Sequence, residues 1–175
     1  EKPHHAVERM LRDCRVNTIL EGSSEIMRLF IAREALDFHL KAMKVLLNPK
    51  VSPAVKIKTA ISTAFRYLLW YSRLWIPCIL GVGIGLPSPL KGHMKFVKYT
   101  SSRLAREIFH KMVLHQQKLV NMQNMINRFV DIGTELFSMS CSCSYAHSLI
   151  KKDKDEKNSI ELADLFCRQA KERVK

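Results

Sequence analysis

Apolar residues recur every three or four positions along most of this chain, a pattern that predicts an all-helical fold. The first helix is expected over residues 4–16 and the second over about 24–46. Gly22 interrupts the pattern between them, and the hydroxyl of Ser23 or Ser24 can cap the second helix. The chain therefore begins with two helices joined by a short loop.

The middle of the chain is basic and aromatic. Residues 54–66 fit a basic amphipathic helix, and residues 67–86 are about as long as a membrane span. Arg73 and Pro77 interrupt that second stretch, and its aromatic rings alternate with arginine. This mixture suits the lipid headgroup region better than the bilayer centre, so we interpret residues 67–86 as a segment lying on a surface.

The last third of the chain again has a helical pattern. No proline occurs over residues 93–150, and residues 115–118 are the best candidate for a turn between two antiparallel helices. A charged loop then leads to a final helix capped by Asn158 or Ser159. No strand pattern is evident, which predicts a small antiparallel helical bundle at this end.

Composition and charge narrow the possible functions. The chain has 175 residues, 47% of them apolar, which is enough for a packed core. Only six glycines and six prolines are present, too few for the many turns of a β-sandwich. The net charge is +13, and its excess lies in residues 41–128, which hold fifteen basic side chains and one acid, Glu107. Such a concentration indicates an anionic surface or ligand.

The five cysteines do not predict disulfides or a metal site. Their number is odd and their spacing irregular, which favours a reducing compartment. Cys141, Cys143 and His147 are close enough on one helix to suggest metal ligands, but no second ligand pair lies at structural-zinc spacing. We expect packed thiols and no metal. The first residue is Glu1 instead of methionine, which fits a processed chain or part of a longer one.

One segment carries a specific resemblance. Residues 7–33, VERMLRDCRVNTILEGSSEIMRLFIAR, resemble the C-terminal signature of flavin-dependent acyl-CoA dehydrogenases, where a helix ending in Arg-Asp leads through a Glu-Gly-Thr loop into another helix. The matching positions are Glu8, Arg9, Arg12, Asp13, Arg15, Glu21, Gly22, Glu25, Ile26, Arg28 and Arg33.

The rest of the chain is similar to the very-long-chain branch of that family. Residues 115–150 and 160–173 resemble the extra C-terminal helical region of that branch, and residues 50–110 occupy the place of its membrane-associating region. The resemblance implies three parts. Residues 1–47 are the end of the C-terminal helical domain of the dehydrogenase core and carry the catalytic loop. Residues 48–92 are a basic and aromatic membrane-associating linker, and residues 93–175 are the extra helical bundle.

The resemblance also implies a reaction. Acyl-CoA dehydrogenases form a trans double bond next to the thioester of a fatty acyl-CoA, with a carboxylate base and hydride transfer to FAD. The base of most branches corresponds to Glu21, whose pKa an apolar acyl tunnel would raise. The residues of the family that contact FAD correspond to Ser23, Ser24 and Glu25. Those that contact the substrate correspond to Gly22 and Arg33.

Each of these residues also has a simpler interpretation. Without the surrounding signature, Glu21 would be an acid that stabilises the start of the following helix. Arg33 suits a phosphate or ribose of CoA, but it could equally form a surface ion pair with Glu34 or Asp37.

The resemblance further implies partners and a location. These are a fatty acyl-CoA substrate, electron-transfer flavoprotein as electron acceptor, and a homodimer. The expected location is peripheral on the mitochondrial inner membrane (matrix face) or the bacterial cytoplasmic membrane. The chain should lack the N-terminal helical domain and the β-domain of the family, so alone it is expected to hold the base without a working pocket.

Two other functions remain open from the sequence. Residues 41–128 could form a non-catalytic module that docks on an anionic membrane, with each basic side chain contributing about 1 kcal/mol. Nucleic-acid binding is allowed by the charge alone, but no recognition motif supports it and the aromatics are clustered in an apolar run. We therefore expect no nucleic-acid partner.

Overall fold

The computed structural model describes residues 7–17, 19, 24–47, 52–76, 82–152 and 158–174, and all of its regular elements are helices. This confirms the predicted all-α fold. The elements are α1 (Val7–Asn17), α2 (Ser24–Leu47), α3 (Pro53–Trp75), α4 (Ser88–His115), the short 3₁₀ helix η1 (Gln116–Asn121), α5 (Gln123–Lys152) and α6 (Asn158–Val174).

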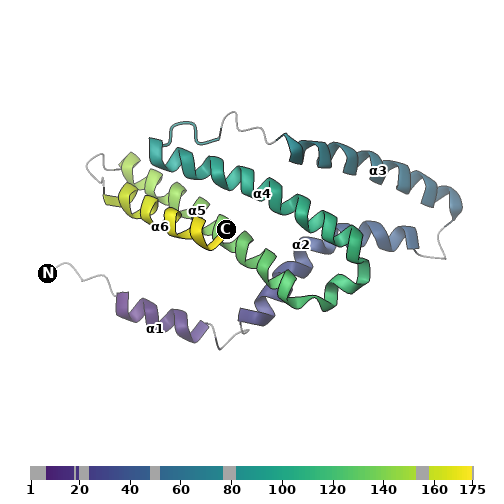
Figure 1. Ribbon diagram of the computed structural model, residues 1–175, viewed down its shortest axis with the longest axis horizontal. Coiled ribbons are helices and arrows are strands. Elements are labelled where there is room, and N and C mark those ends of the chain that lie inside the picture. Colours follow the sequence, from purple (N-terminus) through teal and green to yellow (C-terminus); the bar gives the residue numbers. More distant parts are fainter. Residues whose placement is uncertain are drawn as a thin grey trace.

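Helices α4, α5 and α6 form an antiparallel bundle, as Figure 1 shows. Its core holds two leucines and one methionine among small residues, all inaccessible to solvent or nearly so. Small side chains between α5 and α6 let these two helices lie close together and exclude water from the seam. The core residues are Leu90, Leu136, Met139, Cys143, Ala146, Ala163, Cys167 and Ala170.

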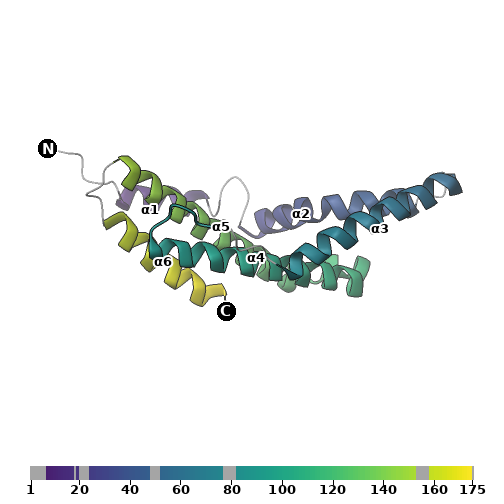
Figure 2. The same cartoon turned by 90° about the horizontal axis from the view of Figure 1, so that it is seen from above.

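Helices α2 and α3 form an antiparallel hairpin that projects from the bundle, which gives the molecule an elongated shape (Figure 2). The first half of α2 packs on α5, and α3 packs on both α2 and α4. Helix α1 lies apart from the bundle in Figure 1, and none of the other described helices packs against it.

The predicted boundaries agree with the structure except in the middle of the chain. Helix α2 begins at Ser24, and η1 occupies the expected turn between the two long helices. Residues 54–66 and 67–86 were expected to form separate segments, whereas α3 continues without a break through Trp75. Pro53 lies in the first turn of α3, where its missing N–H costs no hydrogen bond because the first amides of a helix have no partner within the helix.

A tight turn at residues 82–85 leads into α4. Gly83 has a positive φ of 73°, and a Cβ there would lie 3.2 Å from the Cγ of Lys91. Both the backbone conformation and this close approach favour glycine. The turn thereby fixes where α4 starts.

Leu119 of η1 and Ile126 and Val130 of α5 are buried, whereas Phe137 of α5 is 70% exposed. Bilayer-spanning helices are not found in the described part of the chain, because none of its helices combines enough length with enough hydrophobicity.

Candidate functional site

The start of α2 is the part of the predicted site that the structure describes. Ser24 and Glu25 lie in its first turn, both exposed to solvent. Amides at the start of a helix have no partner within it, so this end can donate hydrogen bonds to an anionic or carbonyl group. Glu21, Gly22 and Ser23 lie outside the described residues.

The two arginines further along α2 have different surroundings. The Nε of Arg28 donates a hydrogen bond of 2.8 Å to Oδ1 of Asp131 on α5. Arg33 is exposed. Asp37, one of the two acids considered as its partners, instead binds the Nζ of Lys41 at 2.5 Å. The structure therefore leaves the side chain of Arg33 at a solvent-facing position on α2.

The first half of α2 is apolar on nearly every side. Ala32, Ala35 and Leu36 face α5 and line an apolar cavity of about 430 Å³ with side chains of α4 and α5. The remaining sides carry large apolar side chains that stay at least 39% exposed. A helix that is apolar all round is normally buried on all sides. The exposed residues on these sides are Ile26, Met27, Leu29 and Phe30, whereas the partly exposed Ile31 lines the cavity.

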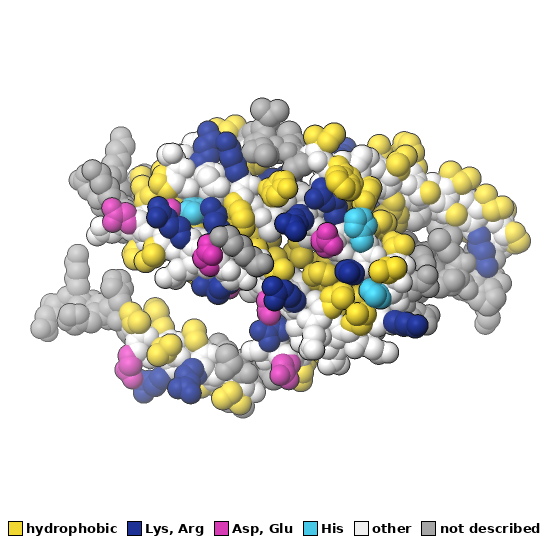
Figure 3. Space-filling model, in the orientation of Figure 1, with side chains coloured by type: hydrophobic (Ala, Val, Ile, Leu, Met, Phe, Trp, Pro, Cys, Tyr) yellow, Lys and Arg dark blue, Asp and Glu magenta, His cyan; other side chains and the backbone are white. Residues whose placement is uncertain are grey.

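Helix α1 shows the same excess of uncovered apolar surface. Its apolar face includes Val7, Met10 and Leu11, each more than 60% exposed. Figure 3 shows yellow side chains gathered along α1 at the lower left, and another yellow band along the outer edge of α3 at the upper right. Exposed apolar surface of this extent marks an interaction surface.

Helix α3 presents a second apolar face. We define the α3 stripe as Ile57, Ile61, Phe65 and Leu68, which recur at helical spacing and are all more than 60% exposed. Helix α3 contains no aspartate or glutamate but four basic residues. The stripe therefore combines exposed apolar side chains with positive charge.

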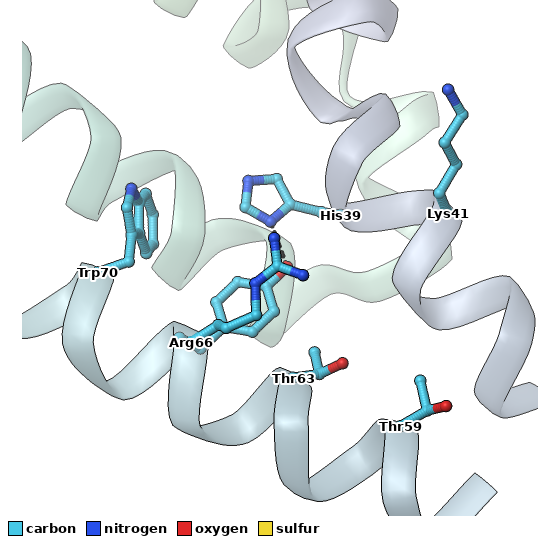
Figure 4. Close-up of a pocket in the computed structure, with 7 residues that line it drawn as sticks. His39, Lys41, Thr59, Thr63, Arg66 and Trp70 are labelled. Carbon is cyan, nitrogen blue, oxygen red and sulfur yellow. Dashed lines mark hydrogen bonds between the residues drawn. The ribbon is translucent and has the colours of Figure 1, made fainter. Parts of the chain in front are cut away.

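The opposite face of α3 forms a cavity with α2, which we call the hairpin cavity. It has a volume of about 560 Å³. Figure 4 shows Arg66 of α3 reaching toward His39 of α2, with Trp70 beside them. The lining residues are His39, Lys41, Thr59, Thr63, Arg66, Tyr67 and Trp70.

An aromatic cluster closes one side of the hairpin cavity. The hydroxyl of Tyr67 and Nδ1 of His39 form a hydrogen bond, and their rings stack at a centroid distance of 5.5 Å. Partial burial lowers the pKa of His39 and raises the pKa of Tyr67, so burial favours the neutral form of both groups. Tyr67 and Trp70 also contact Phe109 of α4. These rings, interpreted from the sequence as facing a lipid boundary, join α2, α3 and α4.

A buried polar group links α4 to α6. His93 is 5% exposed, and its Nε2 lies 2.7 Å from Oδ1 of Asp164, whose other oxygen binds Arg168 at 2.8 Å. The hydrogen bond with His93, followed by the contacts with Arg168, lowers the pKa of Asp164, and burial opposes this shift. The Nδ1 of His93 has no partner among the described residues. This geometry holds the two helices together at the edge of the core.

The cysteines considered as metal ligands are separated by the fold. Cys143 is buried with its Sγ 3.7 Å from that of Cys167 on α6, while Cys141 is exposed. Across the described ranges, no three histidine, cysteine or acidic side chains are grouped closely enough to hold a metal ion. The close thiol pair forms part of the core seam.

Sequence reasoning missed the hairpin cavity and the contacts between helices. Thr59, Thr63, Arg66 and Trp70 share one face of a helix without acids, a signal that was present in the sequence. Their partner His39 and the pair of Arg28 with Asp131 depend on packing between distant segments, which one sequence does not encode in its spacing.

Comparison with known families places both ends of the chain. Residues 2–36 match the family described as Acyl-CoA dehydrogenase, C-terminal domain. Residues 88–175, half of the chain, match the family described as ACAD9/ACADV, C-terminal domain. The first match contains the start of α2, and the second covers the α4–α6 bundle.

Individual relatives agree with these matches. The chain is 42% identical over 175 residues to the probable acyl-CoA dehydrogenase FadE10 of Mycobacterium tuberculosis, covering 96% of this chain and 26% of that protein. It is 26% identical over 171 residues to the human very long-chain specific acyl-CoA dehydrogenase, mitochondrial, and over 176 residues to its rat counterpart, each time covering 97% of this chain and 26% of the relative. The chain thus spans about a quarter of the length of these curated relatives.

Proposed function

Because the chain belongs to the acyl-CoA dehydrogenase family, we propose that it serves as the C-terminal part of an enzyme that dehydrogenates long-chain fatty acyl-CoA at the α and β carbons. The observation that carries this proposal is the two-sided character of α2. One side packs on α5, and the other side exposes Ile26, Met27 and Phe30. A dehydrogenase core on that second side would bury them.

The proposed base is Glu21. It precedes Ser24 by three residues, so the start of α2 would support the loop that carries it. An apolar surface nearby raises the pKa of a carboxyl group and suits it to remove a proton from a weakly acidic carbon. Glu21 would take the α-proton of the acyl chain, and Gly22 and Arg33 would contact the CoA portion.

Acyl-CoA dehydrogenases depend on FAD, which accepts the β-hydrogen as hydride. We assign Ser23, Ser24 and Glu25 to one edge of the FAD site. The exposed hydroxyl of Ser24 and the unpaired amides at the start of α2 offer hydrogen-bond donors, and this end of the helix favours an anionic or carbonyl group. The rest of a FAD site would come from the additional core, so the isolated chain should not turn over substrate.

The proposal also assigns the organisation of the chain. Residues 1–47 would complete the core, residues 48–92 would form the linker that contacts a membrane, and residues 93–175 would form the extra bundle. A homodimer, electron-transfer flavoprotein as acceptor, and a mitochondrial or bacterial membrane location complete the proposal by analogy with the family.

The test is Glu21→Gln in the polypeptide extended to the length of its relatives. We expect bound FAD, seen in the visible absorption spectrum, together with a loss of acyl-CoA dehydrogenation of several orders of magnitude. Glu34→Gln is the matched control, since this exposed glutamate of α2 lies outside the proposed site. Full activity of the Glu21 variant would remove Glu21 from the mechanism.

A second function is favoured by the α3 stripe. We infer that this helix docks on an anionic membrane, because its exposed apolar side chains would enter the lipid interface while Lys56 and Lys58, on either side of Ile57, contact headgroups. Sedimentation with anionic vesicles should retain the chain at low salt and release it at high salt.

The stripe itself needs a separate control. Ile61→Asp should abolish binding to vesicles, whereas Leu162→Asp, at an equally exposed leucine on α6, should not. Equal retention by neutral and anionic vesicles would contradict the docking function.

A further inference from the structure

The hairpin cavity has the size of a small-molecule site. Its volume of about 560 Å³ lies within the usual range for ligand pockets. Thr59, Thr63, Arg66 and Trp70 project into it from successive turns of α3, and His39 faces them from α2 (Figure 4). The walls of the cavity therefore come from both α2 and α3.

The polar part of the lining suits a phosphate group. Among the described lining residues none is acidic, and α3 contains no acid along its whole length. Lys41 contributes its aliphatic carbons to the lining, because its ammonium group binds Asp37. Arg66 supplies a planar guanidinium that can bind two phosphate oxygens at once, and Thr59 and Thr63 add hydroxyl donors to the same lining.

The rest of the lining suits an organic group. Trp70 and the stacked pair of His39 and Tyr67 form an aromatic wall beside Arg66. Aromatic side chains bind apolar or aromatic groups through burial and ring contacts. A ligand that joins a phosphate to such a group would match both parts of the cavity.

The position of the cavity indicates a soluble ligand. Each residue of the α3 stripe precedes a cavity residue by two positions, as Ile61 precedes Thr63. Two positions correspond to a rotation of about 200° around a helix. The cavity and the stripe thus lie on opposite sides of α3, so a lipid held in a membrane against the stripe would not reach the cavity.

We propose that the hairpin cavity binds a soluble phosphate ester with an apolar or aromatic organic group, with Arg66 and Thr63 holding the phosphate and Trp70 contacting the organic part. The site is separate from the start of α2 and from the α3 stripe. Dehydrogenation is not required for it, whereas the choice of a soluble ligand over a lipid rests on the docking proposed for the α3 stripe.

Phenyl phosphate is the smallest probe with both features. The full chain has two tryptophans, so Trp75→Phe leaves Trp70 as the only fluorescent indole. We expect phenyl phosphate to change Trp70 fluorescence saturably, with a Kd of about 1 mM or below. Phenol or inorganic phosphate alone should bind at least about tenfold more weakly, because each lacks one of the two contacts.

Two substitutions locate the phosphate. Arg66→Gln should weaken phenyl phosphate binding about tenfold or more, and Thr63→Val should weaken it by a smaller factor. Arg73→Gln is the matched control, since Arg73 is an exposed arginine of the same helix that does not line the cavity. Circular dichroism should show unchanged helix content in all three variants.

Several results would overturn the site. They are the absence of saturable binding, equal binding of phenol and phenyl phosphate, and an equal loss of affinity in the Arg66 and Arg73 variants. A Trp70 response to phosphatidic acid vesicles that phenyl phosphate does not reproduce would assign the cavity to a membrane lipid and would likewise reject the soluble ligand.

Discussion

The Nε of Arg28 lies 2.8 Å from Oδ1 of Asp131, and this ion pair joins the second turn of α2 to α5 across 103 positions of sequence. It lies one helical turn after Ser24, at the part of α2 that we assign to the active site. The C-terminal bundle is thereby connected directly to the segment that would carry the catalytic loop.

Reversing the charges of this pair tests the connection. Arg28→Asp and Asp131→Arg should each destabilise the chain, and the double variant should recover most of the loss. We expect a coupling free energy of about 0.2–1 kcal/mol from urea unfolding, because both side chains are partly exposed. Additive effects in the double variant would mean that the pair contributes nothing in solution.

The pair of His93 and Asp164 should make stability depend on pH. The hydrogen bond with His93 lowers the pKa of Asp164 from its usual value near 3.8. The charged form is therefore favoured by folding, and its contribution is present above pH 3.8 and is lost as the pH falls through the lower folded-state pKa. Urea unfolding between pH 7 and pH 2 should show this loss, and Asp164→Asn should show less of it.

Removing Asp164 should also reduce stability at neutral pH. Asp164→Ala leaves the buried ring of His93 without its partner, which should cost about 1–3 kcal/mol. Glu161→Ala, at an exposed acid of the same helix, is the control and should stay within about 0.5 kcal/mol. Equal effects of the two substitutions would show that the buried contact is unimportant.

Thiol reactivity provides a direct test of the core seam. In a Cys78→Ser chain, Cys14 and Cys141 should react rapidly with an aromatic disulfide reagent, because both are exposed. Cys143 and Cys167 are inaccessible to solvent and should react only after unfolding by denaturant. Rapid reaction of all four thiols in the folded chain would contradict the packing of α5 against α6.

The exposed apolar side of α2 should behave differently in the isolated chain and in the extended enzyme. Phe30→Ser should change the stability of the isolated chain by no more than about 0.5 kcal/mol, since Phe30 is 56% exposed. In the polypeptide extended to the length of its relatives, the same change should cost about 2–4 kcal/mol, because the side chain would be buried there. A loss of equal size in both proteins would reject the proposed position of α2.

The sequence was sufficient for the parts of the fold that depend on local patterns. The start of α2 at Ser24 followed from a capping hydroxyl, and η1 overlaps the turn expected at residues 115–118. The continuation of α3 through Tyr67 and Trp70 was missed, because a run of aromatic and aliphatic residues does not distinguish lipid contact from packing against Phe109.

The candidate site was predictable only through the resemblance. Glu21 and Gly22 gain meaning from the surrounding signature, and they lie outside the described residues. The hairpin cavity could not be derived in this way, since His39 and Arg66 meet only when α2 and α3 fold back on each other.

The apolar surface around α2 has a consequence for sequence variation. A helix with one free side accepts polar replacements once per turn, so a saturation-mutagenesis profile across α6 should rise and fall with a period near 3.6 residues. In an enzyme that also covers the side bearing Phe30, the profile across residues 26–36 should stay uniformly low. A low tolerance of polar substitutions that does not vary with the helical period would then indicate a helix packed between two domains.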